Sequence, residues 1–229
     1  MNDDKWPTDW PRLFGLAAHE LATPLSLVQG YARFLQSPKM DAFPEKHQNI
    51  YAELDRVAAR ALQVTQKMRE LQAFETGRRW WAGEKTEISL ENVIREAIAT
   101  PGRWWDPQVA VDVLINPGET AVMAHADPLK RAVVAVVSWV CGELGRKQRY
   151  CMHIRIADSP GPSRNIVVAE TADLTRAAVL PDAHLERFDD YQDFTSLDLP
   201  LATRTIEAHG GRIWWLEGTI GLRVALPLP

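Results

Sequence analysis

The sequence has no long hydrophobic run and no excess of basic residues. Its apolar stretch at residues 132–141 is about ten residues long, whereas a membrane-spanning helix needs about 20. The first residues are acidic, unlike the basic start of a signal peptide. The 26 Lys and Arg residues are outnumbered by 30 Asp and Glu, so the chain has no excess of positive charge with which to bind nucleic acid. We therefore expect a cytoplasmic protein with no membrane span and no nucleic-acid partner.

Cysteine is scarce as well, since Cys141 and Cys151 are the only two in 229 residues. They show no metal-ligand spacing, so we expect free, buried thiols in a reducing compartment. Four further histidines also lack any spacing that suggests metal: His47, His125, His153 and His184. The sequence therefore predicts no metal site.

What the sequence does contain is two long amphipathic segments, at residues 10–36 and 45–75. Apolar residues recur in steps of three and four, a pattern typical of helices that pack along one stripe. The stripes are Leu21, Leu25, Val28, Ala32 and Leu35 in the first segment, and Ile50, Leu54, Val57, Ala61, Val64, Met68 and Leu71 in the second. Two such helices cannot bury their stripes alone. We expect an antiparallel hairpin that dimerises into a four-helix bundle.

Beyond a linker at residues 77–87, the pattern changes to mixed helix and strand. Alternating or apolar runs predict strands at 109–115, 151–157, 166–169, 212–217 and 222–226, with a turn at 159–165. Helices are expected at 90–99, 128–144 and 199–208, the last ended by Gly210 and Gly211. The predicted class is α+β, with a helical domain at 1–76 and a mixed α/β domain at 88–229.

A short motif near the start of the chain carries the most specific signal. Residues 14–25 read FGLAAHELATPL, which resembles the H box of two-component histidine kinases, F-x4-H-E-L-R-T-P-L, at seven positions. The resemblance implies that the hairpin is a dimerisation and phosphoacceptor domain and that His19 carries the phosphoryl group. Ala22 stands where the family usually has arginine, so one positive charge near the histidine is missing.

The residue spacing agrees with this interpretation. His19 is two residues from Leu21, about 200° around the helix from the apolar stripe, so it should face solvent. A neutral imidazole is a competent nucleophile towards phosphorus. Glu20 lies about 100° away and reaches the ring only sideways or through a bound partner. Thr23 lies one turn further on, where its hydroxyl can position a water or a phosphoryl oxygen. His19, Glu20 and Thr23 are the predicted catalytic residues.

The C-terminal part is similar to the ATP-binding domain of the same kinases. Residues 199–214 read LPLATRTIEAHGGRIW and follow the family motif G-L-G-L-A-I-V-K-R-I-V-E-A-H-G-G-R-I-W, and residues 88–96 resemble the first helix of that domain. The two resemblances together span roughly residues 13–229. They imply an α/β sandwich of the histidine kinase ATP-binding type.

The nucleotide-binding positions are where the match fails. The family's second glycine box falls on Ser196 and Asp198, and its two asparagines fall on Ala135 and Trp139. Glycine serves near phosphates because the backbone must approach closely, and an aspartate repels them. The first glycine box is replaced by residues 170–173, which lack glycine, and residues 188–196 are too short for a normal ATP lid.

Magnitudes indicate that these losses abolish nucleotide binding. A polar or charge-assisted contact contributes about 1–3 kcal/mol, and micromolar binding requires only about 8 kcal/mol in total. Losing a Mg²⁺ ligand and two backbone contacts removes most of that. We therefore expect neither ATP binding nor autophosphorylation, and no cofactor.

Three functions are compatible with this combination. The first is a histidine phosphotransferase that exchanges phosphoryl groups with response-regulator receiver domains through His19. The second is a receiver phosphatase, in which Glu20 and Thr23 match the E-x-x-T pattern. The third is a non-catalytic scaffold that binds a receiver or a kinase. A receiver would dock on Leu27, Tyr31 and Phe34, unless these side chains pack against the second helix instead.

Overall fold

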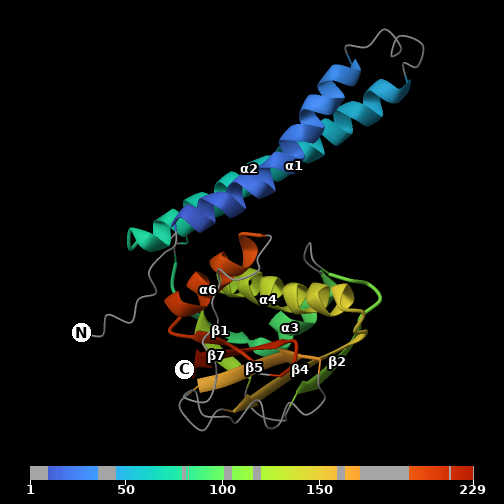
Figure 1. The fold of residues 1–229 in the computed structure, drawn as a ribbon. Helices are drawn as coiled ribbons and strands as arrows, with labels where there is room; N and C mark the ends of the chain where they lie inside the picture. The colour runs from blue at the N-terminus through green and yellow to red at the C-terminus, as the bar shows by residue number, and fades with distance from the viewer. Residues whose placement is uncertain are drawn as a thin grey trace. The chain divides into compact units, whose positions relative to one another are not determined.

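The computed structural model describes residues 10–35, 45–78, 81, 83–100, 105–115, 120–158, 163–170, 196–216 and 218–228. The helices α1 and α2 belong to one compact unit, and the elements from β1 to β7 belong to a second (Figure 1). Among the described helices, none combines the length and the apolar character needed to cross a membrane.

The first unit is a hairpin of α1 (Trp10–Leu35) and α2 (Glu45–Glu75), which pack along each other. On α2 the buried apolar positions are Ile50, Val57, Val64 and Leu71, one every seven residues, as the predicted stripe requires. On α1 the buried side chains are instead Leu13, Ala17, Glu20 and Pro24. The stripe of α1 that the hairpin buries is therefore displaced from the one that the apolar pattern indicated.

A second apolar stripe is left exposed on each helix. Phe14 and Leu25 on α1 are 60% and 54% exposed, and Tyr51 and Leu62 on α2 are 56% and 70% exposed. Within each pair the residues are eleven positions apart, which returns to the same side of a helix after about three turns. Leu25 belongs to the stripe expected from the sequence. Each helix therefore has two apolar sides, of which the hairpin covers one.

The second unit is built on a five-stranded mixed sheet of order β2-β4-β5-β7-β6. Its strands are β2 (Ala110–Ile115), β4 (Cys151–Asp158), β5 (Ser163–Ala169), β6 (Arg212–Trp215) and β7 (Gly221–Pro227). The β2–β4 pair is parallel and the other pairs are antiparallel. A separate two-stranded sheet joins β1 (Thr86–Ser89) to β3 (Ala121–Ala124).

Three helices cover one face of the large sheet: α3 (Leu90–Ala99), α4 (Ala126–Arg146) and α6 (Asp198–Ala208) (Figure 1). Apolar side chains of α4 such as Val137 and Val140 are fully buried, as are Ile154 on β4 and Val168 on β5. Burial of this apolar surface holds the layers together. The α+β class and the mixed sheet predicted from the sequence are confirmed.

Most element boundaries agree with the sequence pattern, and the disagreements have identifiable causes. Strands β1 and β3 were not expected, because four residues are too few to display an alternating pattern. The prediction of a turn through residue 165 was wrong, since β5 begins at Ser163 and pairs with β7 from there. Residues 163–165 are polar, so the apolar pattern did not indicate the start of β5. The domain boundaries at residues 76 and 88 stay a prediction.

The C-terminal end of α6 was predicted correctly. Gly210 has a φ of +83° and its N–H donates to the carbonyl of Glu207, while the N–H of Gly211 donates to the carbonyl of Ile206. This pair of hydrogen bonds is the Schellman motif, which favours glycine at the left-handed position. The chain is thereby turned from α6 into β6.

Gly211→Ala should destabilise the second unit by about 1–3 kcal/mol, because the added Cβ would overpack the core. It would lie 2.4 Å from the carbonyl oxygen of Ala225 and 2.8 Å from a methyl group of Ile206. Thermal unfolding monitored by circular dichroism measures the effect. Gly30→Ala on α1 is the matched control, because a Cβ at that position would meet nothing within 4 Å and alanine favours a helix. An unchanged melting temperature for Gly211→Ala would contradict the close packing.

Candidate functional site

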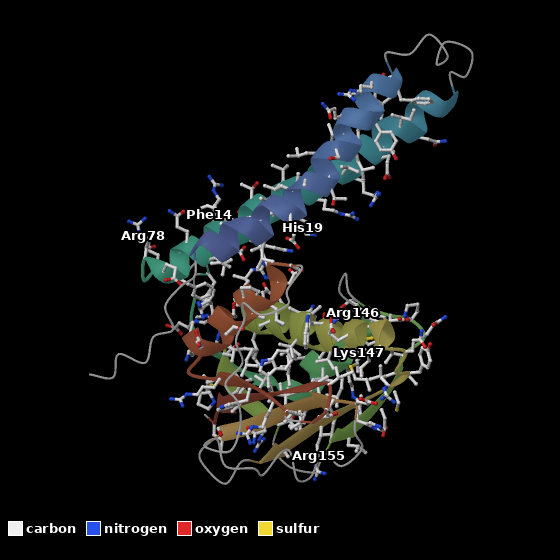
Figure 2. The ribbon with its side chains drawn as sticks, viewed as in Figure 1. Phe14, His19, Arg78, Arg146, Lys147 and Arg155 are labelled. Atoms are coloured by element: carbon white, nitrogen blue, oxygen red, sulfur yellow. The ribbon has the colours of Figure 1, made fainter. Side chains whose placement is uncertain are left out.

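The H-box residues divide between two sides of α1. His19 and Thr23 are both exposed and lie one helical turn apart on the same side of the helix. Figure 2 labels His19 on α1, further along the helix than Phe14. An exposed imidazole can be approached by a partner, as phosphoryl transfer requires. The sequence expectation that His19 faces solvent agrees with its position.

Glu20 lies about 100° around α1 from His19, on the buried side of the helix. Only 1% of its side chain is exposed, and its Oε2 lies 3.9 Å from Nζ of Lys67 on α2. On the same stretch of α2, the amide of Gln66 donates to the carboxylate of Glu70, which is also buried. Once α1 and α2 are packed, each charge of this pair depends on the other, because removing one partner would leave the other charge without its counter-charge. In this arrangement Glu20 anchors the helix that carries His19.

The proposed docking residues continue the His19 side of α1. Leu27 and Phe34 are 39% and 46% exposed, and Tyr31 is half-buried. At 100° per residue, Leu27 lies about 80° and Phe34 about 60° around the helix from His19. These two side chains therefore do not pack into the hairpin, and they leave an apolar strip beside the histidine.

The positions of the missing asparagines lie one turn apart on α4. Ala135 and Trp139 are both half-buried, and neither offers a ligand for Mg²⁺. The Trp139 ring packs edge-on against Trp215 of β6, with 5.3 Å between the ring centroids. Such a pair gains about 0.5–1.5 kcal/mol beyond the area it buries. Trp139 thus serves the packing of α4 on the sheet.

The positions of the second glycine box are Ser196, which is buried, and Asp198, which is the first residue of α6. A helix N-terminus carries partial positive charge that binds phosphates in many proteins. The Asp198 carboxylate supplies a negative charge there already, so it stabilises the helix and opposes a bound anion. Residues 171–173, where the first glycine box was expected, and residues 188–195, where the lid was expected, lie outside the described residues.

An aromatic cluster in the second unit had no role assigned from the sequence. Nε2 of His209 accepts a hydrogen bond of 3.0 Å from the backbone N–H of His125, and its Nδ1 lies 2.7 Å from the carbonyl oxygen of Thr205. These partners favour a neutral ring with the proton on Nδ1. Trp81 stacks on His209 with centroids 5.5 Å apart. His209 belongs to the AHGG string that the sequence already displayed, but Trp81 and His125 are far from it in sequence.

Comparison with known proteins agrees with the geometry, although no family model matches the chain. This chain is 24% identical over 199 residues to the sensor protein FixL of Bradyrhizobium diazoefficiens. The matched region covers 86% of this chain and 39% of FixL. The chain thus spans less than half of that relative. The histidine kinase AdeS of Acinetobacter baumannii has a similar fold, with a TM-score of 0.57 at 13% identity over 92% of this chain and 98% of AdeS.

A second solved structure is the histidine kinase ThkA in complex with the response regulator protein TrrA. It gives a TM-score of 0.52 at 16% identity, over 93% of this chain and 60% of that one. The shared fold and the similarity to FixL support a histidine kinase-like protein, as the H-box resemblance indicated. Within the described residues, no group of three or more His, Cys, Asp or Glu side chains is arranged to hold a metal ion.

The two sides of α1 make a testable distinction between Glu20 and Thr23. Glu20→Ala should destabilise the hairpin by about 1–3 kcal/mol, because Lys67 loses a buried counter-charge. Thr23→Ala, at an exposed position, should change stability by less than about 0.5 kcal/mol. Chemical denaturation followed by far-ultraviolet circular dichroism compares the two. Equal stability of both variants would contradict an anchoring role for Glu20.

Proposed function

We propose that this chain is a two-component signalling protein that lacks a working ATP site and acts as a histidine phosphotransferase through His19. The observation that carries the proposal is the exposed His19 of an H-box-like motif, in a chain whose nucleotide positions hold Trp139 and Asp198. The phosphoryl group then has to come from another protein. Receiver domains, which carry an aspartyl phosphate, are the partners of the right chemistry.

The transfer itself requires few groups from this chain. A ring nitrogen of neutral His19 attacks the phosphorus of the aspartyl phosphate, the bond from phosphorus to the carboxylate oxygen breaks, and the aspartate leaves as a carboxylate. The reverse step passes the group to a second receiver. Thr23 lies one turn away on the same exposed side, where its hydroxyl can donate to a phosphoryl oxygen. Glu20 keeps α1 in place through its buried contact with α2.

The docking surface for the receiver is the apolar strip of Leu27, Tyr31 and Phe34. Two of these side chains are substantially exposed, and all three follow His19 along α1. Exposed leucine and phenylalanine are costly in water, and a partner that covers them gains about 25 cal/mol per Å² of buried apolar area. The fold of ThkA resembles that of this chain, and ThkA forms a complex with the response regulator TrrA. This similarity supports a receiver as the partner.

The exposed second stripe of the hairpin supports a homodimer. Phe14, Leu25, Tyr51 and Leu62 are at least half exposed in the single chain. A second copy that covers these four side chains would complete a four-helix bundle, in which each helix buries two sides. His19 lies about 240° around α1 from Leu25, so a dimer through this stripe leaves the histidine accessible.

A phosphatase is the second candidate, because the exposed Thr23 hydroxyl beside His19 can also position a hydrolytic water. The two activities share the same docked receiver and differ in the fate of the phosphoryl group. In transfer it resides on nitrogen. In hydrolysis it leaves as free phosphate.

Phosphotransfer predicts that a receiver radiolabelled at its aspartate transfers label to this chain, and that His19→Gln receives none. The label should survive alkali and be released by acid, as expected for a phosphorus–nitrogen bond. Mg²⁺ with radiolabelled ATP and no receiver should give no label, because the nucleotide site is degenerate. Loss of receiver label as free phosphate, abolished by Thr23→Ala, would instead establish the phosphatase. Stable receiver binding without either reaction would leave only a scaffold.

The dimer and docking surfaces predict separable defects. Leu25→Glu with Leu62→Glu should convert the dimer to monomers, because two carboxylates would be buried at the interface. Leu27→Ala with Phe34→Ala should leave the dimer intact and weaken receiver binding about tenfold or more. Light scattering after size-exclusion chromatography and receiver titration measure the two properties. A wild-type chain that is monomeric at micromolar concentration would contradict the proposed dimer.

A further inference from the structure

A cysteine, a histidine and an aspartate line up at the edge of the five-stranded sheet, in the unit that does not contain His19. Cys151 and His153 lie on β4 and Asp112 lies on the neighbouring edge strand β2. The Cys151 Sγ is 3.3 Å from Nε2 of His153, and Nδ1 of the same ring is 3.3 Å from Oδ2 of Asp112. Nothing in the proposed phosphotransfer uses these residues.

The sheet itself places the three side chains together. Strands β2 and β4 are parallel with Asp112 directly opposite His153, and Cys151 is two residues away on β4. Side chains two residues apart on a strand share a face, and directly opposed residues are neighbours. The other face of β4 carries Met152 and Ile154, both fully buried in the core. The cluster is therefore on the face opposite the core helices.

Accessibility differs along the cluster in a way that suits a reactive thiol. Cys151 is exposed, so the expectation that both thiols are buried was wrong for this residue, and 56% of the Asp112 side chain is exposed. The His153 side chain is only 15% exposed, and the residue opposite it on β5 is the buried Ala169. The imidazole is thus held against the sheet while the sulfur faces solvent. Arg149 and Glu170 form an ion pair at the same end of these strands, with 3.3 Å between nitrogen and oxygen.

The order of the contacts defines what each group can do. Nδ1–H of His153 donates to the Asp112 carboxylate, which leaves the lone pair of Nε2 directed at the Cys151 thiol. A nucleophile, a base and a group that orients the base are the arrangement that activates a cysteine. The cysteine and the aspartate approach opposite nitrogens of one ring, so they do not converge on a point where a metal ion could bind.

We propose that Cys151 is a reactive thiol, with His153 as its base and Asp112 as the residue that positions His153, and that it exchanges with low-molecular-weight disulfides. The Cys151 proton moves to Nε2 of His153, and the sulfur attacks one sulfur of the disulfide. The disulfide bond breaks, and the departing thiolate takes the proton from His153. The products are a mixed disulfide at Cys151 and one free thiol, and the reverse reaction restores Cys151.

Cys141 provides an internal reference within the same unit. It is fully buried in α4 and its Sγ donates to the carbonyl oxygen of Asp106, at 3.5 Å. Burial raises the pKa of the Cys141 thiol, which disfavours the reactive thiolate. Only Cys151 should react while the chain is folded.

The test is the reaction of the full chain with oxidised glutathione near pH 7, followed by intact-mass and peptide mass spectrometry. We expect one glutathione per native chain, on Cys151, and reaction of Cys141 only after denaturation. His153→Gln should slow the modification of Cys151 about tenfold, because the thiol loses its base. Asp112→Asn should slow it less, and Asp112→Glu should restore much of the rate by returning a carboxylate.

Two comparisons keep the test specific. Glu87→Gln removes an exposed carboxylate from β1 in the same unit and should leave the rate unchanged. Melting temperatures of all variants show whether a slower rate reflects altered chemistry or altered folding. The proposal fails if Cys151 of the wild type reacts no faster than in His153→Gln at equal stability, or if native Cys141 is modified instead. Because His19 takes no part, the outcome is independent of the phosphotransfer result.

Discussion

Burial of one face of the five-stranded sheet beneath α4 is the constraint from which most of the second unit follows. Ile154 and Val168 fill this face, and Val137 and Val140 of α4 cover it. Since side chains alternate along a strand, every residue placed in this layer commits its neighbours to the opposite face. The same alternation that buries Met152 therefore leaves Cys151 and His153 outside, beside Asp112.

The inner layer also includes positions that correspond, by the resemblance to the kinases, to those that bind nucleotide. By the resemblance to the kinases, the α4 positions of Ala135 and Trp139 are those at which a nucleotide-binding member carries polar side chains for Mg²⁺ and phosphate. Here Trp139 packs against Trp215 and contributes to the core instead. Asp198 similarly places its carboxylate at the N-terminus of α6. Each change favours the packed unit and disfavours the anion.

Helix α1 has three sides with different roles. One side packs on α2 and includes the buried carboxylate of Glu20, which lies near Lys67. A second side exposes Phe14 and Leu25 for the proposed dimer. The third side carries His19 and the strip towards Phe34. A helix has room for these three sides because successive residues are separated by 100°, so the adjacent residues His19 and Glu20 can serve chemistry and structure separately.

The class of the fold, the two-part organisation and the histidine at the centre of the proposed function could all be predicted from the amino-acid sequence. These features follow from local periodicity and from a contiguous motif around His19, both of which are visible along the chain. Three features became visible only in the folded chain: Glu20 is buried, Leu25 lies off the hairpin interface, and Trp81 stacks on His209. The tertiary structure also brought Asp112 to His153, 41 residues further along the chain. Strand register produces that contact, and register depends on burial across the whole sheet rather than on the spacing of neighbouring residues.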